Sequence, residues 1–252
     1  GRNALQSYVY PFIGKLGVDE IELPHVLACL EPIWHSKTET AVRVRGRIET
    51  VLDWAQVRKY RKKENVARWK GHLDKVLATP SKIQKVEHHK SIPYGEIADF
   101  VSKLKLRQGM ASNALTLLIL TCTRSGEVRG AEWSEVDLDK GIWTIPAERM
   151  KAGKEHRIAL SSAALELLRA LPRVEGSNLL FPGTKGQPLS DMTLLAVMRR
   201  MDVAAVPHGF RSTFRDWVGD CTSYPSDLAE AALAHTLESK VEAAYRRSDA
   251  LE

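Results

Sequence analysis

Apolar residues recur at helical spacing through the first part of the chain. Between Glu39 and about Lys59 they fall on one face of a predicted helix. The members of this face are Val44, Ile48, Val51, Leu52 and Ala55. Before it, an acidic start and a group of leucines and valines predict a short helix from about Pro24 to Glu31. The pattern therefore predicts a small helical N-terminal domain, residues 1–84.

A polar segment, residues 79–91, separates this region from the rest and carries no hydrophobic period. It predicts a linker between domains. Beyond it, "SNALTLLILTC" is almost entirely apolar and predicts a buried helix. Two short runs, "GIWTIPA" and "HRIALS", surround a basic turn and predict a β-hairpin. Five further helices are expected after the hairpin, in "SSAALELLRAL", "SDMTLLAVMRRM", "FRSTFRDWVGD", "PSDLAEAALAH" and "SKVEAAYRR". The predicted fold class is mainly α with a small β-sheet: a helical domain, then a mixed α+β domain over residues 85–252.

Charge adds a candidate surface to the N-terminal domain. The chain has 252 residues, 44% of them hydrophobic, and 37 Lys and Arg against 31 Asp and Glu, for a net charge of +6 and a pI near 9.2. The excess is concentrated between Arg43 and Lys75. Four arginines are expected on one side of the long helix, away from its apolar face. They are Arg43, Arg47, Arg58 and Arg61. A polyanion is the natural partner of such a face, and an ordinary solvated helix surface is the alternative.

Other sequence features exclude several classes of protein. The cysteines Cys29, Cys122 and Cys221 are odd in number and far apart, which argues against a disulfide framework or a zinc site and favours a reducing cytoplasm. No apolar stretch approaches a membrane span, and no signal-peptide pattern is seen at the N-terminus. The adjacent His88 and His89 have no carboxylate or cysteine cluster near them in sequence, so no metal site is expected there. The start at Gly1 suggests a piece of a longer protein.

The first segment with candidate chemistry is "TCTRSGEVRGAEW". Arg124 directly follows the buried apolar helix, and Glu127 stands at the head of the next one. A guanidinium at such a junction needs an anion or internal hydrogen bonds, because burying it unpaired is costly. The sequence leaves two interpretations open: Arg124 holds a ligand anion, or Arg124 forms a plain ion pair with Glu127.

Two later segments carry histidine, arginine and tyrosine. In "PHGFRSTFRDW", His208 and Arg211 lie three residues apart, on one face of a helix start that favours an anion. Near the end, His235 precedes Tyr245 by ten residues. A tyrosine hydroxyl becomes a useful nucleophile only where cations or a base stabilise its phenolate. Taken singly, His208 as a core residue and Tyr245 as a packed ring are the simpler interpretations.

Taken in order, these motifs resemble the tyrosine recombinases, particularly the integrases of phages and genomic islands. The resemblance runs from about Tyr94 to Asp249, and "ERMKAGKEHRIALS" and "LAHTLESKVEAAYRRSD" belong to it together with the segments above. The helical N-terminal region is similar to the core-binding domain of that family.

The resemblance implies a role for each motif residue. Arg124 and Arg211 would grip the nonbridging oxygens of the scissile phosphate, and His235 would donate a further hydrogen bond to it. Tyr245 would attack the phosphorus with the assistance of His208. Lys151 would protonate the departing 5′ oxygen, with Lys154 as a rival for that role. Glu127 would support the site from behind, and neither a metal nor another cofactor is implied.

The resemblance also implies partners and leaves alternatives. Double-stranded attachment-site DNA would be the substrate, bound by a homotetramer that forms on DNA from monomers, with accessory excision or bending proteins. The cytoplasm would be the site of action, with no membrane partner. A type IB topoisomerase shares the catalytic residue types, and a DNA-binding regulator could keep the fold without catalysis.

Overall fold

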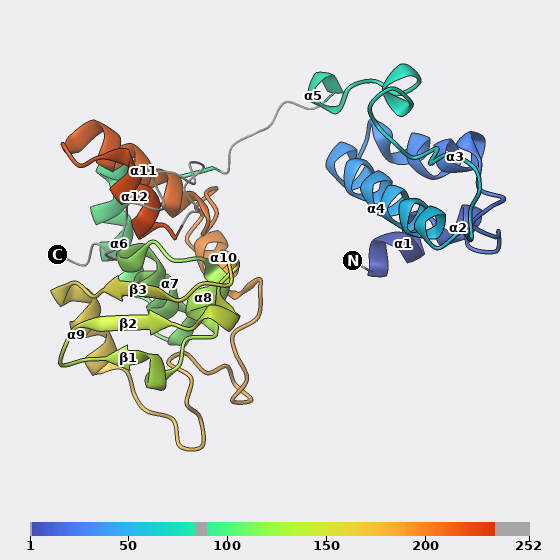
Figure 1. The fold of residues 1–252 in the computed structure, drawn as a ribbon. Helices are drawn as coiled ribbons and strands as arrows, with labels where there is room; N and C mark the ends of the chain where they lie inside the picture. Colours follow the sequence, from blue (N-terminus) through green and yellow to red (C-terminus); the bar gives the residue numbers. More distant parts are fainter. Residues whose placement is uncertain (1, 84–89, 235–252) are drawn as a thin grey trace. The chain divides into compact units, whose positions relative to one another are not determined.

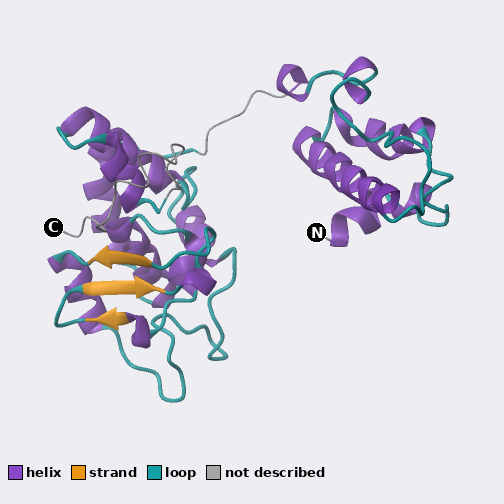
Figure 2. Ribbon diagram, viewed as in Figure 1, coloured by secondary structure: helices purple, strands orange, loops and turns teal. Residues whose placement is uncertain are grey.

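The computed structural model describes residues 2–83 and 90–234, and these two ranges belong to two separate compact units (Figure 1). Helices dominate both units, and three strands occur in the second (Figure 2). The predicted fold class, mainly helical with a small sheet, is confirmed. The predicted helix "SKVEAAYRR", with Tyr245, and the preceding His235 lie outside the described residues.

The first unit is built on two packed helices, α3 (Leu23–Trp34) and α4 (Thr38–Val57). Around them lie α1 (Arg2–Tyr8), α2 (Tyr10–Ile13), a 3-10 turn (Leu73–Lys75) and α5 (Pro80–Ile83). Val44, Ile48 and Leu52 of α4 are buried, as the helical period predicts. The same period predicted that Val51 is buried, and this prediction is wrong, since Val51 is 47% exposed. Trp34 stacks on Trp69, with 5.6 Å between the ring centroids, and its indole N–H donates to the Ala78 carbonyl at 2.9 Å.

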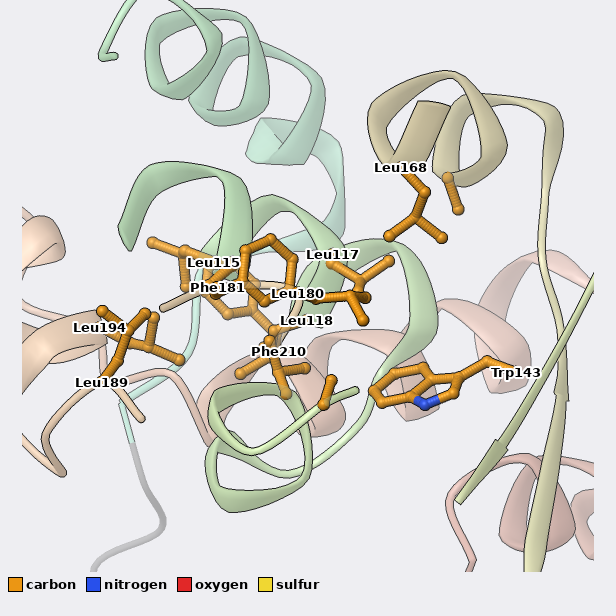
Figure 3. Close-up of a cluster of buried hydrophobic side chains, with 14 of the residues drawn as sticks. Leu115, Leu117, Leu118, Trp143, Leu168, Leu180, Phe181, Leu189, Leu194 and Phe210 are labelled. Carbon is orange, nitrogen blue, oxygen red and sulfur yellow. The ribbon is translucent and has the colours of Figure 1, made fainter. Parts of the chain in front are cut away.

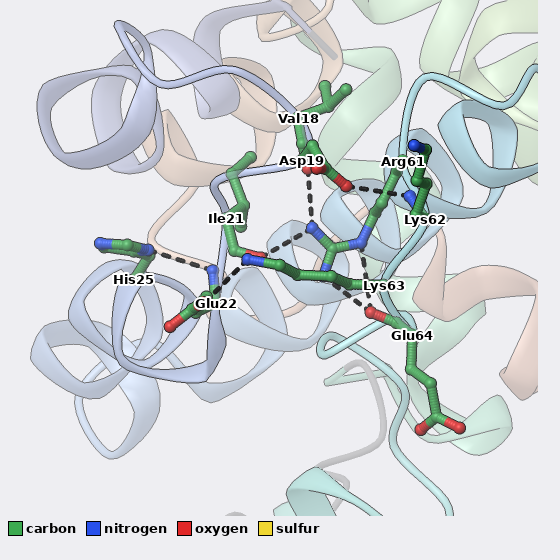
Figure 4. Close-up of polar contacts among 9 residues, drawn as sticks. All are labelled: Val18, Asp19, Ile21, Glu22, His25, Arg61, Lys62, Lys63 and Glu64. Atoms are coloured by element: carbon green, nitrogen blue, oxygen red, sulfur yellow. Dashed lines mark hydrogen bonds and ion pairs between the residues drawn. The ribbon is translucent and has the colours of Figure 1, made fainter.

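The placement of Arg61 on the outer basic face is wrong. Helix α4 ends at Val57, and Lys59 takes a left-handed backbone conformation (φ 62°), so the chain turns before Arg61 is reached. The Arg61 side chain is buried inside the unit (Figure 4). Its guanidinium donates to the carbonyls of Val18 (2.7 Å), Ile21 (2.7 Å) and Glu64 (2.7 Å). Arg61 therefore ties the segment before α3 to the segment after α4, and it is not available to DNA.

Replacing Arg61 with methionine should destabilise the first unit by about 3 kcal/mol, because three backbone carbonyls, in buried or part-buried hydrogen bonds, lose a charged donor. Arg43→Met is the matched control. Arg43 is exposed and pairs with exposed Glu39, so its change should stay within about 0.5 kcal/mol. Denaturant-dependent hydrogen exchange of peptides from residues 18–64 measures the first unit separately from the second. Equal effects of the two substitutions would show that the Arg61 contacts contribute little.

The second unit packs helices on one three-stranded antiparallel sheet of order β1-β2-β3 (Figure 2). Strand β2 (Ile142–Ile145) pairs with β3 (His156–Ala159), so that Trp143 lies opposite Ile158 and Ile145 opposite His156. The predicted hairpin is thus present, and the short edge strand β1 (Val136–Asp137) was not predicted.

The central helix of this unit is α7 (Met110–Thr121), whose leucines Leu115, Leu117 and Leu118 are fully buried with Phe181 (Figure 3). The other helices lie around it. They are α6 (Ile97–Lys105), α8 (Ser125–Arg129), α9 (Ser162–Ala170), α10 (Thr193–Arg200), α11 (Gly209–Cys221) and α12 (Ser226–Ala232), with 3-10 turns at Tyr94–Glu96, Trp133–Glu135 and Ala147–Arg149. No described helix is both long and apolar enough to cross a membrane.

Glycine is required where α11 begins. A Cβ on Gly209 would collide with the backbone carbonyl of Lys90 and lie 2.9 Å from Cα of Ser91. Ile92, in the same segment as Lys90 and Ser91, accepts a hydrogen bond at its carbonyl from the Thr213 hydroxyl (2.6 Å). These contacts lock the first turns of α11, and with them the side chain of Arg211, onto the rest of the unit.

Candidate active site

The site begins where α7 ends. Cys122 adopts the left-handed conformation (φ 51°), which ends α7, and Arg124 two residues later is the N-cap of α8. The buried Glu127 carboxylate accepts from the backbone N–H of Arg124 at 2.7 Å and from its guanidinium at 2.8 Å. One carboxylate therefore both closes the start of α8 and fixes the direction of the Arg124 side chain.

The second arginine, Arg211, reaches the same place from α11. It is 4% exposed, and its guanidinium donates to the carbonyl of Cys122 at 2.6 Å and to that of Leu233 at 2.5 Å. Burial lowers the pKa of Arg211, and the positive charge of Arg124 lowers it further, while Glu127 opposes both. Two guanidinium groups of like charge are held together here, which is an arrangement suited to an anion.

Two successive carbonyls directly after α12 complete the described part of the site. Arg211 donates to Leu233, and Arg124 donates over a longer 3.4 Å to Ala234. Ala232, the last residue of α12, lines the same cavity as His156, the first residue of β3. Carbonyls at a helix C-terminus carry partial negative charge, so cations are stabilised there.

His156 was not among the predicted site residues. Its pKa is lowered, first by burial and also by Arg124 and Arg211, whereas Glu127 raises it. The signal for it was the strand period in "HRIALS": His156 shares the strand face of buried Ile158, so it had to point inward.

Arg149 is a second residue that sequence reasoning missed. Its guanidinium pairs with the Glu135 carboxylate and donates to the carbonyl of Glu127. The other carboxylate oxygen of Glu135 accepts from the Trp143 indole at 3.0 Å. Arg149 therefore couples the sheet to α8 and holds the backbone of Glu127 from behind.

The remaining predicted residues divide into three groups. Lys151 and Lys154 are both exposed on the connection between β2 and β3, and their positions do not separate them. His208 is exposed at the N-cap of α11, and its carbonyl accepts from the Arg211 backbone N–H at 3.2 Å. His235 and Tyr245 lie outside the described residues, although His235 directly follows Ala234 in the chain.

On the first unit, the predicted basic face retains three arginines. Arg43 and Arg58 are exposed and Arg47 is half-buried. Arg58 lies over the ring of exposed Trp54, 5.7 Å from its centroid. Among the residues that the structure describes, no group of three or more His, Cys, Asp or Glu could hold a metal ion.

Two family patterns match the chain. The phage integrase central domain matches residues 1–72, and the phage integrase family matches residues 94–252. Among curated proteins, the integrase of Enterobacteria phage P4 is 29% identical over 96% of this chain. Prophage integrase IntZ of Escherichia coli K12 is 33% identical over 93% of it. The alignments cover 58% of each relative, so the chain spans somewhat more than half of their length.

Solved structures share the fold. A lambda integrase (75–356) dimer bound to a COC′ core site superposes with a TM-score of 0.67 at 17% identity, covering 100% of this chain and 89% of that one. A lambda integrase tetramer bound to a Holliday junction gives 0.67 at 18% identity, with coverages of 95% and 72%. The family pattern extends over the larger part of the chain and includes Arg124, Glu127 and Arg211, and the chain therefore belongs to the phage integrase family.

Proposed function

We propose that this chain is the core-binding and catalytic part of a site-specific DNA recombinase that cleaves and rejoins strands through a 3′-phosphotyrosyl intermediate. The observation that carries the proposal is the convergence of Arg124 and Arg211 beside buried Glu127. Two planar guanidinium forks can hold two oxygens of one phosphodiester and stabilise the charge that develops as phosphorus becomes five-coordinate.

Arg124 has the donors for such a ligand. A guanidinium carries five N–H groups, and the side-chain bonds of Arg124 to Glu127 and Ala234 use two of them. Its bond to Ala234 is long at 3.4 Å, and the side chain is 25% exposed. A phosphate oxygen that approaches from solvent can therefore reach Arg124 while the Glu127 contact stays in place.

The chemistry proceeds in two balanced steps. The Tyr245 oxygen attacks phosphorus and loses its proton with the help of His208, while the bond from phosphorus to the 5′ oxygen breaks. Lys151 protonates that oxygen, and His235 donates to the phosphate. In the second step, the reverse of the first, a 5′-hydroxyl from a partner strand gives its proton to Lys151 and attacks phosphorus, while the bond from phosphorus to the Tyr245 oxygen breaks and that oxygen regains a proton with the help of His208. The phosphodiester bond energy is conserved, so no nucleotide cofactor is consumed.

The substrate is double-stranded attachment-site DNA. Arg43, Arg47 and Arg58 of the first unit would contact its phosphates, which predicts salt-sensitive binding. Integration and excision of a phage or genomic island would be carried out by four copies assembled on DNA, helped by accessory bending or excision proteins. The reaction would take place in the bacterial cytoplasm.

The test uses a nicked suicide substrate that contains the core site, recovered from the junctions of the element that carries the coding region. Loss of the short strand beyond the nick should trap a covalent protein–DNA complex, and two intact sites should give recombinants. DNA binding without a covalent complex would favour the non-catalytic regulator. Supercoil relaxation without recombinants would favour the type IB topoisomerase.

The general acid can be identified with a substrate that has sulfur in place of the 5′ bridging oxygen. Lys151→Ala should slow cleavage of the ordinary substrate by about 10²–10⁴-fold. The same variant should cleave the sulfur substrate near the parent rate, because a thiolate leaves without protonation. Lys154→Ala is the control, and it should cleave both substrates like the parent. The reverse pattern would assign the role to Lys154.

A further inference from the structure

The outward side of α4 carries a tryptophan among its arginines. Arg43, Arg47, Thr50, Trp54 and Arg58 follow one another at intervals of three or four residues, so their side chains lie in one row along the helix and its C-cap. We call this row the outer face of α4. Trp54 is 55% exposed there, although the side of a helix that is turned to water is normally polar. The outer face therefore combines positive charge with a large exposed ring.

Trp54 belongs to an exposed apolar patch. Val51 and Val57 lie one turn before and after it on α4, and Tyr60 follows the helix end; all three are exposed. A single exposed apolar side chain is common on a protein surface, but four that adjoin one another indicate a surface that binds a partner.

Two contacts hold the Trp54 ring in place. Lys59 has a left-handed backbone, which allows the backbone N–H of Tyr60 to donate to the Ala55 carbonyl at 2.9 Å. This turn places the Tyr60 ring against that of Trp54, with 5.7 Å between the centroids. Arg58 lies over the Trp54 ring, also at 5.7 Å. A ring that is supported in this way loses little further freedom when it binds a partner.

The charge around the patch indicates which partner fits it. The residues three and four positions before and after Trp54 include no acid; they are Thr50, Val51, Val57 and Arg58. The carboxylate of the adjacent Asp53 accepts from the Asn65 side-chain amide at 2.7 Å. Because DNA offers phosphates to the arginines and apolar groups to the ring, the outer face of α4 is complementary to DNA.

Duplex DNA exposes few apolar groups to a protein. Stacking covers the faces of its bases, but the major groove, about 12 Å wide, admits an α-helix and presents the C5-methyl group of thymine. On the outer face of α4, Trp54 stands between Arg47 on one side and Arg58 on the other. Such a row can bind phosphates through its arginines while the ring between them reaches the base edges.

We propose that Trp54 is a specificity-determining residue: its indole contacts the C5-methyl group of a thymine in the major groove of the attachment-site DNA, while Tyr60 and Arg58 hold the ring. The inference rests on the proposed function, in which double-stranded DNA is the substrate. It adds sequence selection to a face whose phosphate contacts alone give affinity without specificity.

The test measures the affinity of the full chain for a core-site duplex in which each thymine in turn is replaced by uracil, which lacks only the methyl group. For the parent, uracil at one or two positions should weaken binding about three- to fivefold, the effect of losing one buried methyl group. Trp54→Ala should bind the thymine duplex about tenfold more weakly and should no longer distinguish uracil at those positions. Trp54→Phe, which keeps an aromatic ring, should retain the discrimination.

Salt dependence separates this contact from phosphate binding. Arg58→Ala should lower the slope of log affinity against log salt by about one, whereas Trp54→Ala should leave the slope unchanged. Phe12→Ala, at an exposed aromatic residue outside α4, is the control, and it should bind both duplexes like the parent.

Three results would overturn the proposal. The first is uracil discrimination that persists in Trp54→Ala. The second is weaker binding by Trp54→Ala when no uracil affects the parent, which would indicate a sugar contact. The third is parent-like affinity of Trp54→Ala, and poorer assembly of copies on DNA would then make the patch a protein interface. If the parent binds the core site but forms no covalent complex, the proposed catalysis has failed, whereas the affinities still decide the role of Trp54.

Discussion

Replacing Arg211 with alanine is expected to lower the rate of strand cleavage by about 10²–10³-fold, the usual effect of losing one preorganised donor to a developing charge. The substitution also removes a structural contact, because the Arg211 guanidinium joins the end of α7 to the end of α12 through the Cys122 and Leu233 carbonyls. The alanine variant should therefore also show faster hydrogen exchange at both helix ends.

Two variants separate these effects. Arg211→Lys keeps the charge but loses the planar fork, so it should bind DNA normally and still cleave slowly. Arg215→Ala removes an arginine one turn further along α11, where the side chain is 59% exposed and pairs with Glu230. It should cleave at nearly the parent rate. Rapid cleavage by either Arg211 variant would mean that the phosphate is held elsewhere.

Replacing Tyr245 with phenylalanine is expected to abolish the covalent complex, with a loss of at least about 10⁴-fold, because removing a nucleophile leaves only the binding and charge-stabilising groups. Binding of the nicked substrate should be retained, since the ring remains. The measurement is covalent trapping followed by identification of the modified peptide.

Tyr224→Phe is the matched control. Tyr224 is an exposed tyrosine of the same unit, so it tests whether deletion of any nearby hydroxyl impairs trapping. It should trap DNA like the parent. If Tyr245→Phe traps as much DNA as the parent, Tyr245 is not the nucleophile.

The helical period predicted most of the buried face of α4 and gave a wrong position just beyond the end of that helix. Val44, Ile48 and Leu52 are buried as predicted. Arg61 was placed by extending the same period, but the left-handed Lys59 had already ended the helix. A positive φ at a lysine has no sequence signature, and the carbonyls that bind Arg61 come from residues 18–21, far away in the chain. Local pattern could not predict such a contact.

The site shows the same division between local and distant information. The spacing of Arg124 and Glu127 within one turn left an ion pair and a bound anion both open, and the structure contains the ion pair. The pairing of Arg149 with Glu135 joins residues that no local period relates. The strand period of "HRIALS" contains the information that His156 shares a face with buried Ile158, but it could not show which residues lie opposite that face.

The sequence by itself determined the fold class, the hairpin, the family resemblance and the identity of the candidate catalytic residues. These follow from short-range patterns: hydrophobic periods, helix starts, and motifs whose order along the chain is informative. Only the tertiary structure decided that Arg61 is buried, that Arg124 and Arg211 lie close together, and that Arg149 pairs with Glu135. Those facts depend on where distant carbonyls and carboxylates meet in space, because a buried cation takes whichever acceptors the packed fold brings to it.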